Sequence, residues 1–477
     1  MKHPESKTAK HLLCVMLILF TFVHLLSASQ ATASSRPSMV LFLADDMSVL
    51  DCSAYGSKDM RTPNMQRVAD AGLTFDRAFV ASPSCAPSRA ALLTGLMPAR
   101  NGAEANHAHP RRDVKKWPAY FQELGYEVVA FGKVAHYQQT IEYGFDLFAH
   151  DTFHDHQAIP AALEYLKHRD HASTRPLCLI VGTNWPHVPW PETIAGFNPA
   201  SFKLPAGSID TTITRKLRAE YAAAVSEADK DLGAVYDTAH ALLPKDTLYL
   251  FSSDHGAQWP FAKWNCYDAG IRVPMMIEWA GKLKAGTRTS AMVSWIDLLP
   301  TLLEAAGGTA PSNIDGQSFY KVLTGKETEH RDKIYTTHTG DGHWNIYPTR
   351  SLRTAQWKYI LNLHPEFAFT CHIDLPGELT QRDMWVEWMD AGKTDTRAAA
   401  IVKRYHARPS EELYDLTSDP DEQKNLAEEP TQHARLGQMR TDLKEWMRAQ
   451  DDQTTVPAPP RLLSDPTAYG PGAKLSK

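Results

Sequence analysis

The sequence has few cysteines, and no two of them form a Cys-x-x-Cys pair. The six lie far apart along the chain: Cys14, Cys52, Cys85, Cys178, Cys266 and Cys371. Without such pairs, a structural zinc site or a thioredoxin-type redox motif is not expected. Because Cys14 falls in the leader predicted below, five cysteines remain, an odd number for an exported protein. One thiol is therefore expected to pair with another chain or to undergo chemistry of its own.

The sequence also lacks an excess of positive charge and any strong compositional bias. The formal net charge is -5, and the predicted leader contributes +2 to it, so the exported chain would carry -7. This balance argues against nucleic acid as the principal partner. Hydrophobic residues at 43% and charged residues at 22% are ordinary globular values, which argue against a disordered or fibrous protein. The chain of 477 residues is long enough for a large α/β domain with an appendage.

Long apolar runs are absent except near the N-terminus. There, three lysines precede an apolar run over residues 12–26, and a small-residue Ala-x-Ala site ends at Ala33. This pattern predicts a signal peptide over residues 1–33, cleaved near Ala33. The run is short for a transmembrane helix, although a retained anchor stays as an alternative. We therefore expect a secreted or periplasmic protein without stable membrane insertion.

Four short apolar runs of the kind that forms buried strands each lead into a polar loop. The runs cover residues 39–43, 128–131, 177–181 and 248–251. The loops that follow them contain Asp45-Asp46, Gly132-Lys133, Asn184-Trp185-Pro186-His187 and Asp254-His255-Gly256. Strand-like runs that alternate with helical periodicity predict an α/β fold with a large mixed central sheet flanked by helices. Since the site of an open α/β sheet lies beyond the carboxyl ends of its strands, these loops are the expected site.

The pattern changes after about residue 330. Residues 349–353 and 358–361 are typical of hairpin strands, and a closing helix would place Leu436, Met439, Leu443 and Trp446 on one face. The sequence therefore predicts an α/β domain over residues 34–330, a smaller C-terminal α+β subdomain over residues 331–455 and a flexible, proline-rich tail over residues 456–477.

The segment Pro83–Gly95, with the sequence PSCAPSRAALLTG, is the most informative for chemistry. Pro87 suits the first position of a helix. Cys85 would then lie just before a helix N-terminus, where free N–H groups favour negative charge. These physical features alone are equally compatible with a buried structural cysteine.

The pattern Cys85-x-Pro87-Ser88-Arg89, followed by Leu92-Leu93-Thr94-Gly95, resembles the signature of the type I sulfatases of the alkaline phosphatase superfamily. Other segments similar to that family follow in the same order: Gly132-Lys133-Val134-Ala135-His136, Gly270-Ile271-Arg272-Val273-Pro274 and Glu412-Leu413-Tyr414-Asp415. The resemblance implies a sulfatase in which a formylglycine-generating enzyme converts Cys85 into the aldehyde formylglycine.

The resemblance also implies one bound Ca²⁺ ion. Its implied ligands are Asp45, Asp46, Asp254, His255 and the oxygen derived from Cys85. Carboxylate oxygens suit Ca²⁺. Many members of the family have Asn where His255 stands, although a subset has His. Because a nitrogen ligand is less typical of Ca²⁺, Mg²⁺, Mn²⁺ and Zn²⁺ remain alternatives.

A set of cationic side chains is implied to act on the sulfate group: Lys133, His136, His187 and Lys263, with Arg89 positioning residue 85. Cations are needed because negative charge builds on the sulfuryl oxygens in the transition state. In the implied reaction the hydrated aldehyde attacks sulfur, and its second hydroxyl then collapses to expel sulfate. His187 is the expected acid for the leaving atom, whereas the base is either Asp254 or His136.

The implied substrate is a sulfated carbohydrate or polysaccharide. Expected substrate contacts are His107, His109, Arg111, Trp185, His343 and Arg350. The layout is somewhat similar to that of heparan N-sulfatases and bacterial glycan exo-sulfatases, so an N-linked sulfate stays open beside an O-linked one. Two other functions remain as alternatives. One is a phosphonate or phosphate ester hydrolase of the same superfamily, and the other is a non-catalytic exported glycan-binding protein on a sulfatase scaffold.

Overall fold

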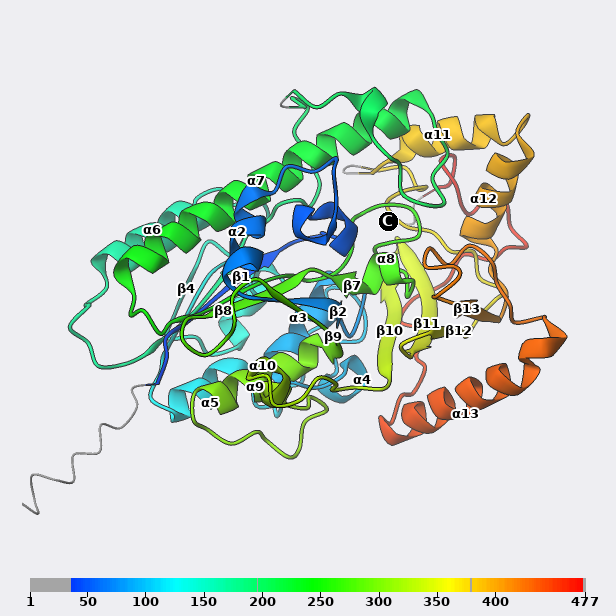
Figure 1. The fold of residues 1–477 in the computed structure, drawn as a ribbon. Helices are drawn as coiled ribbons and strands as arrows, with labels where there is room; N and C mark the ends of the chain where they lie inside the picture. The colour runs from blue at the N-terminus through cyan, green and yellow to red at the C-terminus, as the bar shows by residue number, and fades with distance from the viewer. Residues whose placement is uncertain (1–35, 195, 378–379, 475–477) are drawn as a thin grey trace, which may run out of the picture. The chain divides into compact units, whose positions relative to one another are not determined.

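The computed structural model describes residues 36–194, 196–377 and 380–474, and the predicted signal peptide lies outside them. Residues Pro37–Lys477 form one compact unit with a nine-stranded mixed sheet and a four-stranded sheet (Figure 1). The predicted α/β class, with a large mixed sheet flanked by helices and a smaller C-terminal α+β part, is confirmed. Within the described ranges, no helix combines the length and apolarity needed to span a bilayer.

The large sheet is built around parallel strands whose carboxyl ends lie at one edge. Their order is β4 (Leu147–Ala149), β3 (Glu127–Gly132), β5 (Leu177–Gly182), β1 (Met39–Ala44) and β6 (Leu248–Ser253). Each of them runs parallel to its neighbour. The four strands that the apolar runs predict are therefore adjacent, and the loops that follow them are brought together.

The remaining strands of this sheet lie beyond β6 and beside β2. They are β8 (Met275–Trp279), β2 (Leu73–Phe79), β7 (Arg272–Val273) and β9 (Thr287–Ser294). β8 is antiparallel to both β6 and β2, whereas β9 is parallel to β2. The sheet is therefore mixed, as predicted.

Side chains of the central strands alternate between two hydrophobic cores because successive residues of a strand point to opposite faces. Val40 and Phe42 belong to the core that contains α2 (Pro63–Ala71), α6 (Ala158–His168) and α7 (Thr212–Leu242). Met39 and Leu41 belong to the core that contains α3 (Cys85–Thr94), α5 (Trp117–Glu123) and α9 (Leu298–Ala305). Figure 1 shows helices on both sides of the sheet. Burial of both faces explains why these strands are apolar throughout rather than alternating with polar residues.

Short helices connect the larger elements. The α-helical ones are α4 (Pro98–Asn101), α8 (Asp268–Ile271) and α10 (Tyr320–Leu323). The 3-10 helices are η1 (Val49–Asp51), η2 (Ser53–Tyr55), η3 (Tyr137–Glu142), η4 (Pro199–Ser201), η5 (Trp295–Asp297) and η6 (Pro430–Gln432).

The smaller sheet is antiparallel and begins at Ile334. Its order is β10 (Ile334–Asp341), β11 (Asn345–Arg353), β12 (Trp357–Asn362) and β13 (Glu411–Asp415). The other helices of this region are α11 (Arg382–Ala391), α12 (Thr396–His406) and α13 (His433–Ala449). The predicted hairpin is formed by β11 and β12. A β-bridge joins Leu462, in the segment predicted as a tail, to Phe367.

Helix α13 is the predicted closing helix, and it packs on the smaller sheet. Leu436, Met439 and Leu443 are buried against it, at the spacing of one helical face. Trp446 is only partly buried and stacks on Tyr335, with ring centroids 4.4 Å apart. The helical period places Met447, four residues after Leu443, in the last core position instead.

A buried cluster of charges joins the two sheets. Asp268, at the start of α8, lies 3.1 Å from the Arg353 guanidinium of β11 and 2.8 Å from the Lys358 ammonium of β12. Burial alone raises the pKa of Asp268, but Arg353 and Lys358 outweigh burial and hold that pKa well below its usual value. The carboxylate is therefore ionised and neutralises two buried cations.

We expect Asp268→Asn to destabilise the protein by about 3–5 kcal/mol, because it leaves Arg353 buried without a counter-charge and Lys358 with only the more distant Glu422, at 3.5 Å. Urea unfolding at neutral pH measures the change. The control is Asp237→Asn: the Asp237 side chain is 59% exposed and pairs with Arg67 at the surface, so its loss is expected to cost about 1 kcal/mol or less. Equal losses for the two variants would contradict a linking role for Asp268.

Candidate active site

Charged and imidazole side chains that follow four neighbouring strands meet beyond the carboxyl edge of the large sheet. Asp45 and Asp46 follow β1, Asp254 and His255 follow β6, and Lys133 follows β3; all of these side chains are fully buried. His187, in the loop after β5, is 12% exposed. The structure therefore brings together the strand-end residues that the sequence singled out.

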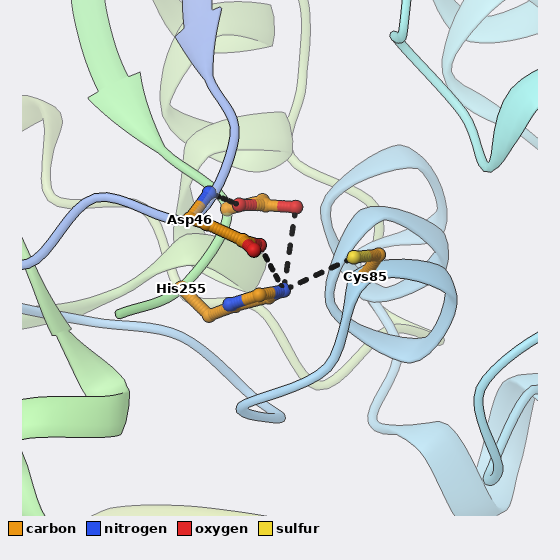
Figure 2. Close-up of side chains that lie close together, drawn as sticks. Asp46, Cys85 and His255 are labelled. Carbon is orange, nitrogen blue, oxygen red and sulfur yellow. Dashed lines mark hydrogen bonds and ion pairs between the residues drawn. The ribbon is translucent and has the colours of Figure 1, made fainter. Parts of the chain in front are cut away.

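Cys85 enters this group from helix α3. The helix begins at Cys85 with Ser84 as its N-cap, so Pro87 is its third residue and not its first, as the sequence suggested. Proline is accommodated there because the N–H groups of a first helical turn have no partner within the helix. Cys85 consequently lies inside the first turn and not before it. Figure 2 shows its sulfur facing the ring of His255.

Cys85 is 1% exposed, and its thiol lies among charged groups. Its Sγ is 3.2 Å from His255 Nε2, 3.5 Å from Lys133 Nζ and 4.0 Å from Asp45 Oδ1. A structural cysteine would be expected among apolar side chains. The contacts therefore favour a chemical role for residue 85.

Four potential metal ligands form a compact cluster around this thiol. Donor atoms of Asp46, Cys85, Asp254 and His255 all lie within 4.8 Å of one another, and Figure 2 shows three of these side chains converging. Asp46 Oδ1 is buried and accepts no hydrogen bond in the described part of the chain. A buried carboxylate oxygen without a donor is costly unless a cation satisfies it. The donor set thus fits a divalent cation.

Asp45 is not one of these four, although the sequence analysis included it among the ligands. Its Oδ2 accepts from Lys133 Nζ at 2.6 Å, and its Oδ1 accepts from Arg89 at 3.2 Å. Burial alone raises the pKa of Asp45, but Lys133 and Arg89 outweigh burial and hold that pKa well below its usual value. In this geometry Asp45 anchors two cations beside residue 85.

Arg89 is fully buried and connects three of the strand-end loops. Its Nε donates to Asp254 Oδ2 at 3.0 Å, its second terminal nitrogen donates to Asp45, and its first donates to the carbonyl of Lys133. Arg89 lies one helical turn after Cys85. It is therefore placed to fix residue 85 relative to the carboxylates.

Each of the two buried lysines pairs with a different aspartate of the Asp45-Asp46 pair. Lys133 donates to Asp45, and Lys263 donates to Asp46 Oδ2 at 2.6 Å. Burial alone lowers the pKa of Lys133, but Asp45 outweighs burial and raises it well above its usual value. For Lys263, burial again acts downward, and Asp46 outweighs it and raises the pKa. Both ammonium groups therefore stay charged.

The two histidines near the cluster lie in different electrostatic surroundings. Burial alone lowers the pKa of His255, but Asp254, Cys85 and Asp46 raise it to about 9. For His187, burial together with Lys263 and Lys133 lowers the pKa well below its usual value. His187 Nδ1 lies 2.7 Å from the carbonyl of Val188 and must donate to it, which leaves the lone pair on Nε2. His187 must therefore take up a proton before it can act as an acid.

Of the predicted substrate contacts, His109, Arg111 and His343 are exposed. His109 lies 3.0 Å from Glu142, and Arg111 donates to Asp113 at 3.3 Å. Trp185 is half-buried, and its ring lies against the rings of His154 and His156.

Arg350 and His107 are placed differently from the prediction. Arg350 is fully buried in β11, and its guanidinium donates to Asp452 at 2.8 Å and to the carbonyl of His338 at 2.9 Å. The prediction of a substrate contact is wrong for Arg350, because its donors are used within the protein. His107 is hydrogen-bonded to His136, with 2.7 Å between His107 Nδ1 and His136 Nε2.

Two residues near the site escaped the sequence analysis. The Lys133 ammonium lies 4.5 Å from the centroid of the Tyr137 ring. Tyr137 could have been found from the sequence, because it directly follows the predicted site residue His136. Asp341, at the end of β10, contacts His107 at 3.2 Å. No local pattern marks Asp341, because the contact arises only when the smaller sheet packs beside the large one.

Two family descriptions match the chain. The pattern described as Sulfatase matches residues 37–308, which include every proposed ligand. The pattern described as N-sulphoglucosamine sulphohydrolase, C-terminal, matches residues 255–375 and thus reaches into the smaller sheet.

Individual proteins are similar over most of the chain. An ulvan-active sulfatase from Formosa agariphila is 31% identical over 432 residues, covering 88% of this chain and 81% of that protein. The human N-sulphoglucosamine sulphohydrolase is 26% identical over 465 residues, covering 86% of this chain and 90% of that protein. Both similarities extend across the catalytic region and the smaller sheet.

A solved structure of a phosphonate monoester hydrolase from Silicibacter pomeroyi shares the fold. Its TM-score is 0.67 at 17% identity, and the match covers 88% of this chain and 96% of that one. At this identity the likeness concerns the fold alone. Because the Sulfatase pattern covers more than half of the sequence and the ulvan-active sulfatase is 31% identical over most of it, this chain belongs to the sulfatases, a family of sulfuric ester hydrolases.

Proposed function

We propose that this sulfatase removes sulfate groups from carbohydrates or polysaccharides, with residue 85 as formylglycine and with one bound Ca²⁺ ion. The observation that carries the proposal is the position of Cys85 Sγ, which lies 3.2 Å from His255 and 3.5 Å from Lys133 inside a buried cluster of charges. Two relatives named for carbohydrate substrates, the ulvan-active sulfatase and N-sulphoglucosamine sulphohydrolase, support the substrate class. Both O-linked and N-linked sulfate lie within the proposal.

Asp46, Asp254, His255 and the oxygen derived from Cys85 would hold the ion, and Asp45 stays a predicted further ligand beside them. Hydrated formylglycine supplies a hydroxyl nucleophile, and Ca²⁺ supplies positive charge that favours the ionised hydroxyl. Arg89 orients residue 85 by holding the carboxylates of Asp254 and Asp45 through hydrogen bonds. Rotation of either carboxylate away from Arg89 would break one of the two ion pairs of this buried guanidinium.

Lys133 and Lys263 supply the charge that a sulfuryl group requires. Each ammonium is buried and fixed by a carboxylate at 2.6 Å, so little reorganisation is needed when negative charge develops on the sulfuryl oxygens. The ring of Tyr137 packs against Lys133 and limits its movement. We assign both lysines to binding the sulfuryl oxygens and the leaving atom.

Two histidines are available for proton transfer. His187 Nε2 lies 3.8 Å from Asp46 Oδ2, on the side of Lys263, and we assign it to the proton of the leaving atom. His136, which is 6% exposed, is assigned to the proton released at residue 85. Burial and the Lys133 ammonium lower the pKa of His136 well below its usual value, which keeps the ring neutral and able to accept.

The proposal includes export and maturation. The leader predicted over residues 1–33 would direct the chain to the periplasm or the exterior, and a formylglycine-generating enzyme would act on the Cys85-x-Pro87-Ser88-Arg89 sequence.

The function is tested with a panel of O-sulfated and N-sulfated mono- and oligosaccharides, with the released inorganic sulfate measured directly. We expect sulfate release from at least one carbohydrate, and faster hydrolysis of an aryl sulfate than of the matching aryl phosphonate. Faster phosphonate hydrolysis would point to an ester hydrolase of the other class. Carbohydrate binding without turnover by fully modified, metal-loaded protein would point to a binding protein.

A second prediction concerns residue 85. Peptide mass spectrometry is expected to find formylglycine there in active protein. Cys85→Ser offers one hydroxyl where a hydrated aldehyde offers two, so it should release at most one equivalent of desulfated product and gain one SO₃ group on residue 85. The control is Cys178→Ala, in the buried strand β5, which should keep multiple turnover. Sustained turnover by Cys85→Ser would reject the role of residue 85.

A third prediction concerns the metal. Chelation should abolish turnover, and Ca²⁺ should restore it better than Zn²⁺, because carboxylates dominate the ligand set. Asp46→Asn should lower kcat/KM about 10³-fold or more and reduce the calcium bound per chain, measured by atomic absorption. The control is Asp210→Asn, a carboxylate that is 59% exposed and pairs with Arg215. Full activity in metal-free protein would contradict the prediction.

A further inference from the structure

A chain of three side chains runs from the smaller sheet to the active site. Asp341 Oδ1 lies 3.2 Å from His107 Nε2, and His107 Nδ1 lies 2.7 Å from His136 Nε2. Asp341 ends β10, and His136 directly precedes η3 in the loop after β3. His107 comes from a third segment, the loop after α4. The smaller sheet therefore contacts a proposed catalytic residue through one intermediate imidazole.

The backbone around His107 is held in place. His107 has a φ of 67°, which is uncommon for a residue other than glycine and occurs where surrounding contacts impose it. Gln139 Nε2 donates to the carbonyl of His107 at 3.1 Å. The neighbouring Asn106 donates its backbone N–H to Gly340 at 2.8 Å and accepts from the Ala86 N–H at 3.0 Å. The loop is thus tied to β10 and to the first turn of α3.

The carboxylate at the end of the chain has a fixed orientation. Trp264 Nε1 donates to Asp341 Oδ2 at 2.8 Å, so Oδ1 is the oxygen that faces His107. Burial alone raises the pKa of Asp341, but His107, His372 and Trp264 outweigh burial and hold it well below its usual value. Asp341 therefore stays ionised: Oδ2 accepts from Trp264, and Oδ1, which makes no hydrogen bond among the described residues, lies within ion-pair distance of His107 Nε2.

We propose that Asp341 and His107 are positioning residues that fix the tautomer of His136. In this proposal the ionised Asp341 holds the single ring proton of His107 on Nε2, 3.2 Å from Oδ1, which leaves the lone pair of His107 on Nδ1. His136 Nε2 must then carry the proton that occupies the 2.7 Å contact. The lone pair of His136 is consequently on Nδ1.

This assignment gives His136 a defined chemical role. Its Nδ1 is buried and makes no hydrogen bond within the described residues. It is the nitrogen left for a reactant, and in this tautomer it can only accept a proton. The inference rests on the proposed function in that His136 acts on the proton released at residue 85. It adds which nitrogen acts and which residues determine it.

The His107 side chain is 63% exposed, so its substitution removes little buried surface. A purely structural role would therefore predict small effects at this position. A role in orienting His136 predicts that the effect depends on whether the new side chain can accept a hydrogen bond. His107→Gln keeps an oxygen acceptor, whereas His107→Leu has none.

The main test is Asp341→Asn. Trp264 still donates an N–H, so the amide oxygen will face Trp264 and the amide NH₂ will face His107. This reverses the hydrogen bonds along the chain and moves the His136 proton to Nδ1. Replacing the orienting carboxylate of a serine-protease triad by an amide lowers turnover about 10⁴-fold through the same tautomer effect. We expect kcat/KM for an aryl sulfate to fall about 10²-fold or more.

A second variant removes the constraint on the amide. Adding Trp264→Phe to Asp341→Asn frees the amide to rotate and present its oxygen to His107. In a double-mutant cycle, kcat/KM of the double variant should be about tenfold higher than the value expected if the losses of the two single variants simply multiplied. His107→Gln should keep activity within about tenfold of the parent, and His107→Leu should fall with Asp341→Asn. Unchanged kcat/KM in both Asp341→Asn and His107→Leu would overturn the proposal.

Nitrogen-15 NMR of histidine-labelled protein reads the tautomer independently of activity, with the His136 signals assigned from their loss in His136→Gln. The parent should carry its proton on His136 Nε2, and Asp341→Asn should carry it on Nδ1. A proton on Nδ1 in the parent would overturn the proposal. A parent that hydrolyses no sulfate ester would instead reject the proposed function, and the NMR result would still decide the tautomer. Formylglycine and calcium contents are measured in every variant, so that the comparison is made at equal loading.

Discussion

The buried guanidinium of Arg89 is the interaction on which the arrangement of the site depends. Three carboxylates, two lysines and a thiol lie in a small volume from which water is excluded, and such a group is stable only if each charge has a partner. Arg89 pairs with Asp45 and Asp254 and also binds the carbonyl of Lys133. One side chain on α3 thus fixes the ends of β1, β6 and β3 relative to the helix that carries Cys85.

The smaller sheet contributes to the site as well as to stability. Arg353 and Lys358 reach Asp268 of the large α/β region, and Asp341 reaches His107. In each contact, a strand of the smaller sheet supplies a charged side chain that pairs with a residue outside that sheet. The boundary that we place near residue 330 therefore separates two sheets, while the charged contacts across it are shared.

Much of the fold was accessible from the sequence because it is encoded locally. Buried strands are recognised as continuous apolar runs, and the polar site residues stand immediately after these runs in the sequence. The order of the strands is not local, since β1 lies between β5 and β6, more than 130 residues away. Arg350 was misassigned for the same reason: its partner Asp452 is 102 residues further along the chain. Asp341 escaped notice because its partner His107 comes from another sheet's connecting loop.

The burial of helix α3 limits when residue 85 can be reached. Every residue from Cys85 to Thr94 is buried, so the recognition sequence is inaccessible once the chain has folded. If Cys85 is modified as proposed, the modifying enzyme competes with folding for the same segment. A chain that folds first keeps its thiol permanently. The relative rates of modification and folding, during synthesis and export, would then decide the proportion of active molecules. No later treatment of the folded protein could raise that proportion.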